Sequence, residues 1–248
     1  MGVVASLRRR FLPQLRNSTW AYRQVLESLV TPDTRWLDLG CGHQLLPTWM
    51  EDGDRAAAAL VGRTPFAVGL DQVPSQLVKH TTIRRRVAAD IARLPIRDGA
   101  FDLVSANMVI EHVEDGARLL REVGRVITPG GRFLFHTPNR RFYQIAISMW
   151  VPQGVRRRAA SAIEGREMDD VFPTHYRMNT ASEIASLAAA GGWTVEDLRF
   201  VNSGLTMTRI PPLAVLEIGV TRLLESPAMA SGRSNLVVVL RKQAPPGR

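Results

Sequence analysis

The sequence predicts an α/β fold in which helices cover both faces of a mainly parallel sheet. Short apolar runs alternate with helical patterns over about the first 140 residues, which is typical of strand–helix–strand units. The chain has 248 residues, of which 45% are hydrophobic, and this is enough apolar surface for one domain with a buried core. Ligands of such sheets bind at the carboxyl ends of the strands.

Five strands are expected in this part of the chain, each a short apolar run that ends at polar or glycine residues. They are TRWLDLG (34–40), PFAVGLD (65–71), RRRVAAD (84–90), FDLVSANMV (101–109) and GRFLFHTPN (131–139). The clearest helix between them is EDGARLLREVGRVI (114–127), in which apolar residues share one face. We expect the Pro-Gly-Gly sequence at 129–131 to end this helix.

The regular alternation stops after Asn139, and the rest of the chain is predicted to contain one more helix and two more strands. The helix is TASEIASLAAAGGW (180–193). Thr180 is its expected N-cap, Glu183 completes a capping box, and Gly191-Gly192 ends it. The two strands are WTVEDLRF (193–200) and SNLVVVLRK (234–242).

We therefore expect a single domain over residues 31–248, preceded by a basic helical arm over residues 1–30. Two inserts interrupt the domain, at about 140–178 and 201–234. The first is a mixture of apolar, aromatic and arginine-rich sequence. The second contains LTMTRIPPLAVLEIGVTRLL (205–224), whose two prolines predict a broken amphipathic segment.

Charge and cysteine content narrow the class of protein. A formal net charge of +9 and a pI of about 11.0 favour an anionic partner, which could be a phosphorylated substrate, an acidic membrane face or nucleic acid. One cysteine cannot form an internal disulfide, so a reducing cytoplasm is the expected location. Charges interrupt every apolar segment before the roughly 20 residues that span a bilayer, so no transmembrane helix is predicted.

A glycine-rich turn follows the first predicted strand, in WLDLGCGH (36–43). Backbone amides and a helix N-terminus face the ligand at this position of a doubly wound sheet, and glycine is needed where a Cβ would block the approach. A dinucleotide fingerprint would require a third glycine at the position of Leu45 and an acidic residue nearer than Asp71. A nicotinamide cofactor is therefore disfavoured.

Four motifs in order resemble those of class I S-adenosylmethionine-dependent methyltransferases, in particular the type 11 methyltransferases. They are LDLGCG, GLD, AADIARLPIRDGAFDLVSANMVIEHVED and LLREVGRVITPGGRFLFHTPN, which together span about residues 35–139. The resemblance implies a Rossmann-like, seven-stranded, mainly parallel sheet whose last strand is antiparallel. It also implies S-adenosyl-L-methionine as the cofactor.

The same resemblance assigns the glycine turn to the methionine part of the cofactor. Asp38, Gly40 and Gly42 take that position, and Asp38 is expected to reach the ammonium group through water. Cys41 lies between the glycines and is read as a small residue in a tight loop, with a reactive thiol as the alternative. The family has a further glycine where this chain has Gln44, so the turn departs from the usual pattern there.

Later motifs supply the remaining expected cofactor contacts. Asp71 is expected to accept both ribose hydroxyls, because a carboxylate can take two hydrogen bonds from a diol. Asp90 is expected to accept the adenine amino group beside the backbone of Ile91. Asn107 and Met108 are expected to line the methionine end.

Three histidines fall where a general base could lie if the acceptor is a hydroxyl or a protonated amine. His112 and His175, the latter with Tyr176 beside it, are the candidate catalytic residues, whereas His136 is expected to pack at a strand end. The alternative for His112 is an ordinary residue at the start of a helix. The alternative for His175 and Tyr176 is that they do not contact the substrate. Carboxylates at 111–115 complement a helix N-terminus, so no metal site is predicted.

The acceptor is expected to be recognised by the parts of the chain outside the sheet. These parts are both basic and apolar; they include Arg8–Arg10, Arg140–Arg141, Arg156–Arg158 and Met207–Leu224. Arginines beside an apolar stripe suit peripheral contact with anionic lipid at the inner face of a membrane, and solvated arginines over ordinary core packing are the alternative. The segment FPTHYRMNT (172–180) also resembles inserts of bacterial methyltransferases associated with cell-surface glycans or glycolipids.

The predicted function is therefore methyl transfer by in-line displacement to a small-molecule, glycan or lipid-linked acceptor, with a hydroxyl as the expected nucleophile. An RNA methyltransferase is an alternative, but NMVIEH (107–112) is no base-methylation motif, and aromatic residues make up only 6% of the chain, which disfavours nucleic acid. The second alternative is a non-catalytic scaffold that binds the cofactor. The oligomeric state is left open.

Overall fold

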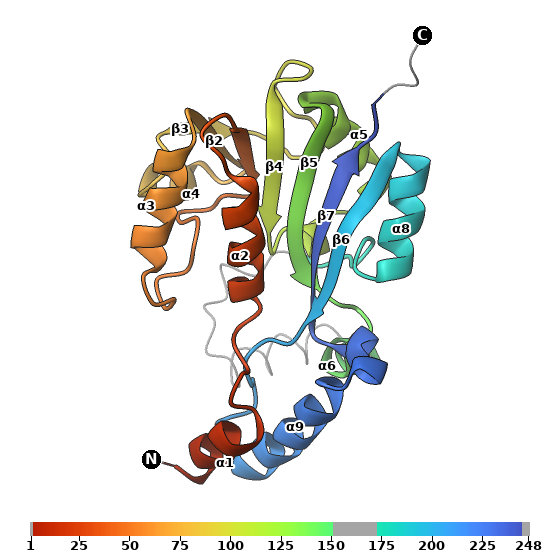
Figure 1. Cartoon of the computed structure of the whole chain (residues 1–248). Helices are drawn as coiled ribbons and strands as arrows, with labels where there is room; N and C mark the ends of the chain where they lie inside the picture. The colour runs from red at the N-terminus through yellow and green to blue at the C-terminus, as the bar shows by residue number, and fades with distance from the viewer. Residues whose placement is uncertain (1, 151–172, 245–248) are drawn as a thin grey trace.

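A sheet with the strand order β3-β2-β1-β4-β5-β7-β6 forms the centre of the fold, with helices on both of its faces (Figure 1). The computed structural model describes residues 2–150 and 173–244. Within these residues the sheet has seven strands. They are β1 (Arg35–Leu39), β2 (Phe66–Asp71), β3 (Arg85–Ala88), β4 (Phe101–Asn107), β5 (Ile127–Pro138), β6 (Trp193–Val201) and β7 (Asn235–Lys242).

The strand directions confirm the predicted fold class. Strands β1 to β5 are paired in parallel, and β7 is antiparallel to both of its neighbours, β5 and β6. The apolar runs are nearly continuous because both faces of the sheet are buried. On β1, for example, Trp36 points into the core on one face and Leu37 into the core on the other.

The helices divide between the two faces. α2 (Thr19–Leu29) and α3 (Gly53–Arg63) share a core with Trp36, and α5 (Gly116–Val126) and α8 (Ala181–Ala190) share the core on the opposite face with Leu37. The remaining α-helices in the described residues are α1 (Val3–Phe11), α4 (Pro74–Lys79), α6 (Tyr143–Trp150) and α9 (Pro211–Leu224). No helix in the described part of the chain is long and apolar enough to cross a membrane.

The N-terminal 30 residues contain two helices with different surroundings. α2 buries Tyr22, Val25 and Leu26 against the sheet, so it belongs to one of the two helical layers. α1 lies outside these layers and packs against α9 (Figure 1). Of the two helices in the predicted arm, only α1 therefore stands apart from the sheet.

Two of the predicted breaks are wrong. Pro129-Gly130-Gly131 do not end α5, which stops at Val126; they lie in β5, where the register against β4 shifts between Phe101 and Leu103 and Gly130 takes a φ of +79°. The pair Pro211-Pro212 does not break its segment but begins α9, a continuous helix of 14 residues. Proline is tolerated in the first turn because the N–H groups there have no helical partner.

The predicted N-cap of α8 is confirmed. The Thr180 side chain accepts a hydrogen bond from the Glu183 N–H (3.2 Å), and the helix ends at Ala190 before the two glycines. The Glu183 carboxylate reaches back to the N–H of Asn179 (3.3 Å).

In the first predicted insert, Arg156–Arg158 lie outside the described residues.

The contact between β2 and the loop after β1 leads to a first prediction. A Cβ added at Gly69 would lie 2.7 Å from the Cys41 Sγ, so we expect Gly69→Ala to destabilise the protein by about 1–3 kcal/mol. Cys41→Ala removes the sulfur, so the double variant is expected to lose less stability than the sum of the two single variants. Urea unfolding measures all three free energies.

Gly62→Ala is the control, because a Cβ at this position in α3 would meet no atom within 4 Å. Replacing a helical glycine with alanine is expected to stabilise the protein by roughly 0.5–1 kcal/mol. Strictly additive effects of Gly69→Ala and Cys41→Ala would contradict the proposed packing role of the thiol.

Candidate functional site

A cavity of about 440 Å³ opens at the carboxyl edge of the sheet, where the loops after β1, β2, β3 and β4 meet. Most of the residues around it come from these loops and from the segment that leads into α5. The described residues that line it are Gly40, Asp71, Gln72, Asp90, Ile91, Ala92, Met108, Val109, His112, Val113, Glu114, Asp115, Arg118 and His175. The strand ends therefore bring predicted cofactor residues and predicted catalytic residues to one place.

The glycine turn after β1 has a backbone that disfavours side chains. Gly40 and Gly42 have φ values of +62° and +53°, in the left-handed region where a Cβ is strained. A Cβ at Gly40 would also lie only 2.4 Å from Cγ2 of Val109, whereas one at Gly42 would meet no atom within 4 Å. The first glycine allows close packing against the loop after β4, and the second is required by the backbone conformation alone.

Asp71 at the end of β2 connects two of the loops that form the cavity. Its Oδ2 accepts the N–H of Gly42 (2.9 Å) and its Oδ1 accepts the N–H of Val73 (2.8 Å). Each carboxylate oxygen has a second lone pair, and the side chain lines the cavity, so both oxygens can still accept a hydrogen bond from a ligand.

Asp90 lies in the loop after β3, the strand next to β2 at the edge of the sheet. Its Oδ1 accepts the N–H of Ala92 (2.8 Å), which orients the carboxylate, and Ile91 lies beside it on the cavity wall. The Arg118 side chain donates from Nε to the Ala92 carbonyl (3.1 Å) and so ties α5 to this loop.

Asp38 does not line the cavity. It is 4% exposed and points to the same face of the sheet as Trp36, because side chains two residues apart on a strand share a face. The Ser105 hydroxyl donates to its Oδ1 and accepts a hydrogen bond from Nε1 of Trp36 (2.7 Å). Burial raises the pKa of Asp38 to about 7; the Ser105 hydrogen bond lowers it, and the negative charge of Asp71 raises it further.

Cys41 is also not among the described residues that line the cavity. Its side chain is buried over Gly69 in β2. Burial, and then the negative charges of Asp38 and Asp71, raise the pKa of its thiol. A neutral buried thiol matches the expected packing role of this residue.

The two predicted residues at the end of β4 have different surroundings. Asn107 is held by a buried network, in which His136 donates from Nδ1 to the Asn107 Oδ1 (2.8 Å) and accepts at Nε2 from the Ser18 hydroxyl (3.0 Å). Burial lowers the pKa of His136 to about 4, so this ring is neutral and packs as expected. Met108, with a φ of +57°, lines the cavity instead.

The candidate catalytic histidines both reach the cavity. Nδ1 of His112 lies 2.8 Å from the carbonyl oxygen of Pro173, which can only accept, so Nδ1 carries a proton and the neutral ring has its lone pair on Nε2. Nε2 of His175 lies 3.4 Å from Oε1 of Glu114. Tyr176 has a φ of +51° and is not among the described residues on the wall.

The backbone of Glu111 places the segment after Pro173 beside the loop after β4. Its carbonyl oxygen accepts the N–H groups of His175 (2.7 Å) and Tyr176 (3.2 Å). Residues more than 60 positions apart in the chain therefore meet at the cavity. Among the described residues, no three His, Cys, Asp or Glu side chains are grouped so that they could hold a metal ion.

Several wall residues were not predicted, and their sequence signals differ. Val109 ends the predicted fourth strand, Val113 follows it, and both read as ordinary apolar positions. Arg118 lies on the polar side of an amphipathic helix, where arginine is common. Gln72 directly follows Asp71 at the strand end, so its position alone could have indicated it.

The strand order, the glycine turn and the carboxylate at the end of β2 define the class of protein as a class I S-adenosylmethionine-dependent methyltransferase. A family model described as a methyltransferase domain matches residues 3–198, so the chain belongs to this family. The protein is a methyltransferase, and its cofactor is S-adenosylmethionine.

Curated relatives carry related names. The chain is 29% identical over 152 residues to an uncharacterized methyltransferase of Mycobacterium tuberculosis, covering 57% of this chain and 72% of that protein. It is 29% identical over 187 residues to a demethylmenaquinone methyltransferase of Mycolicibacterium vanbaalenii (73% and 76% covered). A malonyl-[acyl-carrier protein] O-methyltransferase of Pseudescherichia vulneris is 34% identical over 101 residues (41% and 38%).

Solved structures share the fold at low sequence identity. An S-adenosylmethionine-dependent methyltransferase of Mesorhizobium loti has a TM-score of 0.58 at 20% identity, with 91% of this chain and 98% of that chain covered. A geranyl diphosphate C-methyltransferase of Streptomyces coelicolor, in complex with Mg²⁺, geranyl diphosphate and S-adenosyl-L-homocysteine, has a TM-score of 0.52 at 16% identity, with 90% and 79% covered.

The raised pKa of Asp38 predicts a pH dependence of stability. Between its ordinary pKa of about 4 and its folded value of about 7, the folded carboxyl keeps a proton that the unfolded chain has released. The contribution of Asp38 to the free energy of unfolding therefore falls as the pH rises through this window, by up to about 1.4 kcal/mol per pH unit.

Urea unfolding of the wild type and of Asp38→Asn at several pH values isolates this contribution. His136, whose lowered pKa has the opposite effect, is present in both proteins and cancels in the difference. The wild type is expected to lose stability relative to Asp38→Asn as the pH rises. Parallel stability curves would show that Asp38 is ionised throughout and contradict the prediction.

Proposed function

We propose that the protein transfers a methyl group from S-adenosylmethionine to a hydroxyl group of a small-molecule, glycan or lipid-linked acceptor. One observation carries this proposal: the carboxylates of Asp71 and Asp90 and the imidazoles of His112 and His175 line the same cavity. Groups suited to hold a nucleoside and groups suited to take a proton are thus within one site.

The cofactor's ribose is assigned to Asp71 and its adenine to Asp90. Both carboxylates line the cavity and are oriented by backbone N–H groups. Asp71 has a free lone pair on each oxygen for the two ribose hydroxyls. Gly40 and Met108 are assigned to the methionine end, since both line the cavity at the ends of β1 and β4.

Four of the predicted cofactor residues act on the site indirectly in this proposal: Asp38, Cys41, Gly42 and Asn107. Gly42 donates its N–H to Asp71, Cys41 packs over β2, and Asn107 is held by His136. Asp38 supports the strand from within the core. They shape the turn and the strand ends that carry the contact residues.

S-adenosylmethionine supplies a methyl group that is already activated by the charge on sulfur. The chain therefore has to align an acceptor with that methyl group and to remove the acceptor's proton. Alignment alone can lower the barrier by roughly 7–11 kcal/mol. Positioned residues on four strand ends are suited to this task, because the sheet holds them rigidly.

His112 is assigned as the general base. Its Nδ1 proton is held by the Pro173 carbonyl, so the lone pair of the neutral ring is on Nε2, where it can accept a hydroxyl proton. His175 is assigned to acceptor binding, and its Nε2 lies 3.4 Å from Oε1 of Glu114. Tyr176 belongs to the same segment and is assigned to the acceptor side of the site.

Surface features of this chain indicate the acceptor class, because the names of the relatives point to different acceptors. One name refers to demethylmenaquinone and another to malonyl-[acyl-carrier protein]. Exposed apolar side chains and arginines on α1, α6 and α9 favour an acceptor with an apolar or lipid-linked part.

Titration calorimetry with S-adenosylmethionine tests the cofactor assignment. Asp71→Ala is expected to weaken binding by at least about tenfold, since hydrogen bonds to a charged group contribute about 1.5–3 kcal/mol each. Asp33→Ala, which removes an exposed carboxylate outside the cavity, should bind like the wild type. Unchanged affinity in folded Asp71→Ala would contradict the assignment, and Asp71→Asn provides a second variant if alanine disturbs the loop.

The acceptor proposal is tested with methyl-labelled cofactor and a mycobacterial total lipid extract, chosen because several relatives are mycobacterial. We expect label in the organic phase that resists mild alkali, as a methyl ester would not, and that is released by hydriodic acid, as a C-methyl group would not be. His112→Gln is expected to lower the rate by about 10²–10⁴-fold.

In this assay Asp71→Ala serves as the control for cofactor-dependent transfer, and His80→Gln as a control for a buried histidine outside the cavity. Label that is lost with ribonuclease would favour RNA as the acceptor instead. Equal rates for the wild type and His112→Gln would remove His112 from the role of base.

A further inference from the structure

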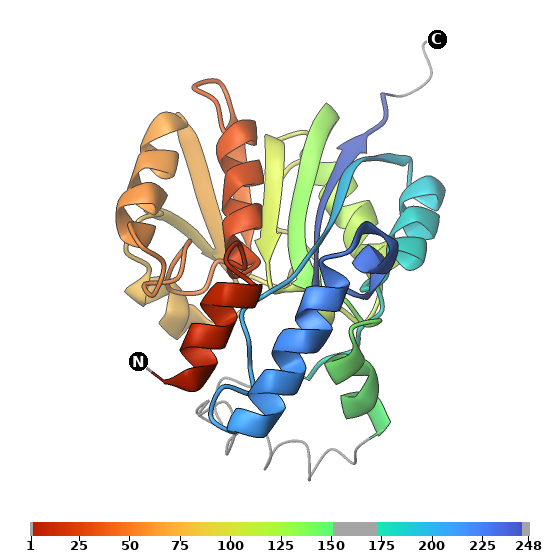
Figure 2. The ribbon, with the colours of Figure 1, turned by 60° about the horizontal axis from the view of Figure 1, so that its bottom comes forward.

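Helices α1, α6 and α9 lie together beyond the carboxyl edge of the sheet (Figures 1 and 2), which is the edge where the cavity residues lie. Val4 and Leu7 of α1 pack against a buried cluster that contains Ile218 of α9. Gln144 of α6 donates from Nε2 to Oε1 of Glu217 in α9 (3.0 Å). The three helices therefore form one surface, here called the helical platform.

α9 has an apolar side that faces the protein and a second apolar side that does not. Its inner side includes Ala214 and Ile218, which are buried. On the outer side, Leu213, Leu216 and Leu223 are 39%, 64% and 57% exposed. These leucines are spaced by three and seven residues, so they form one stripe along the helix.

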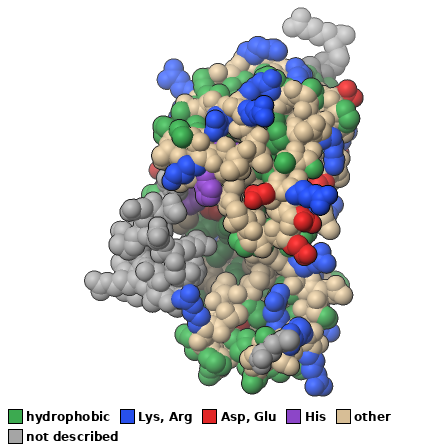
Figure 3. All heavy atoms as spheres, turned by 90° about the vertical axis from the view of Figure 1, so that its left-hand side faces the viewer, with side chains coloured by type: hydrophobic (Ala, Val, Ile, Leu, Met, Phe, Trp, Pro, Cys, Tyr) green, Lys and Arg blue, Asp and Glu red, His purple; other side chains and the backbone are tan. Residues whose placement is uncertain are grey.

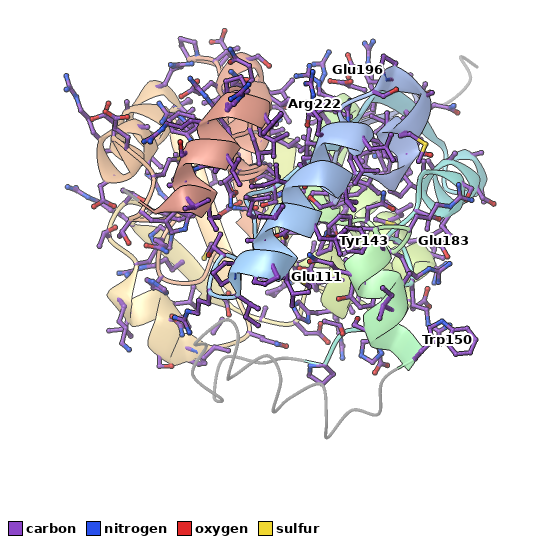
Figure 4. The ribbon with its side chains drawn as sticks, turned by 90° about the horizontal axis from the view of Figure 1, so that it is seen from below. Glu111, Tyr143, Trp150, Glu183, Glu196 and Arg222 are labelled. Atoms are coloured by element: carbon purple, nitrogen blue, oxygen red, sulfur yellow. The ribbon has the colours of Figure 1, made fainter. Side chains whose placement is uncertain are left out.

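The other two helices extend this exposed apolar surface. Val3 and Phe11 at the two ends of α1 are exposed, as are Ile147 and Trp150 on α6. Trp150 is 90% exposed and projects from the end of α6, away from the body of the protein (Figure 4). Monomeric proteins rarely present so many large apolar side chains together unless the patch binds something.

Arginines surround the apolar stripe, and exposed carboxylates are absent from the described residues of the three helices. Arg8 and Arg10 are in α1, and Arg209 and Arg222 lie just before and within α9. The one carboxylate of these helices, Glu217, is buried and accepts the N–H groups of the 206–207 loop. Figure 3 shows blue arginine and green apolar side chains together over this lower part of the molecule.

We propose that the helical platform docks on a lipid bilayer with anionic headgroups. Leucine, phenylalanine and tryptophan side chains suit the boundary between headgroups and acyl chains, and arginines beside them suit anionic headgroups. This inference rests on the proposed function for its purpose, because docking of the platform would hold the carboxyl edge of the sheet, where the cavity lies, near the membrane that carries a lipid-linked acceptor.

A second copy of this chain fits the platform less well than a bilayer. In a twofold dimer each platform would face its own copy, so the four arginines would meet the same four arginines without carboxylates between them. Such like-charge contacts are unfavourable. An anionic bilayer complements both the apolar stripe and the arginines.

Co-sedimentation with vesicles tests the platform with the full-length protein and no methyl acceptor. We compare vesicles of phosphatidylcholine alone with vesicles of equal parts phosphatidylcholine and phosphatidylglycerol. The wild type is expected to bind only the anionic vesicles. Leu216→Glu/Leu223→Glu is expected to weaken binding by about tenfold or more, because it removes apolar contact and adds negative charge. Arg209→Gln/Arg222→Gln is expected to weaken it by roughly fivefold per arginine.

Val78→Glu is the matched control, since Val78 on α4 is 80% exposed and lies outside the platform. It should lose less than twofold, and circular dichroism confirms that all variants are folded. Equal vesicle binding by the wild type and both platform variants, or no binding by the wild type, would overturn the proposal. A wild type that is dimeric by light scattering, with both platform variants monomeric, would also overturn the proposal, because the platform would then be a contact between copies.

Calorimetric titration with S-adenosylmethionine distinguishes this outcome from a failure of the proposed function. The platform variants should bind the cofactor like the wild type, because none of their substituted residues lines the cavity. Cofactor binding without vesicle binding would overturn only the platform. Vesicle binding without cofactor binding would overturn only the assignment of the cavity.

Discussion

The hydrogen bond from the Gly42 N–H to the Asp71 carboxylate is the contact on which the site depends. It joins the turn after β1 to the end of β2, and the N–H of Val73 fixes the other oxygen of the same carboxylate. Gly42 reaches this position only because its φ of +53° is open to glycine without strain. A side chain at the neighbouring Gly40 would collide with Val109, so the turn also determines how closely the loop after β4 approaches. One backbone conformation thereby sets three of the cavity walls.

The wall that contains His175 depends on Glu111, which joins the loop after β4 to the segment after Pro173. Its carbonyl oxygen accepts the backbone N–H groups of His175 and Tyr176, and its buried carboxylate accepts the Thr137 hydroxyl (3.1 Å). Asn179 in turn donates to Thr137 (2.7 Å), so the segment is held at two points. The Thr137 hydroxyl thus donates to Glu111 and accepts from Asn179, which fixes these three side chains relative to one another. The position of His175 thus follows from contacts beneath the cavity.

The sequence predicted the seven strands that the described residues form. The central strands are buried on both faces and read as apolar runs between polar ends, whereas the edge strands β3 and β6 are more exposed. It was wrong where a proline or glycine has more than one structural use: Pro211-Pro212 begin a helix, and Gly130 lies in a strand with a shifted register. Motif resemblance located Asp71 and Asp90 at the cavity but said nothing about side-chain direction at Asp38, which the two-residue period of β1 turns toward Ser105. Resemblance identifies positions, and packing decides which of them face the ligand.

The distribution of charge differs between the cavity and the helical platform. The net charge of +9 does not distinguish between a nucleic acid, a phosphorylated substrate and a membrane, because total charge says nothing of arrangement. In the structure, arginines accompany exposed leucines on α9. The cavity wall instead carries the four carboxylates of Asp71, Asp90, Glu114 and Asp115, against one described arginine, Arg118, whose side chain donates to the Ala92 carbonyl. A polyanion that entered the cavity would meet these carboxylates, and a bilayer beneath the platform would not. The separation of the two charges therefore favours an acceptor that is held by the membrane and presents only its neutral, nucleophilic end to the cavity.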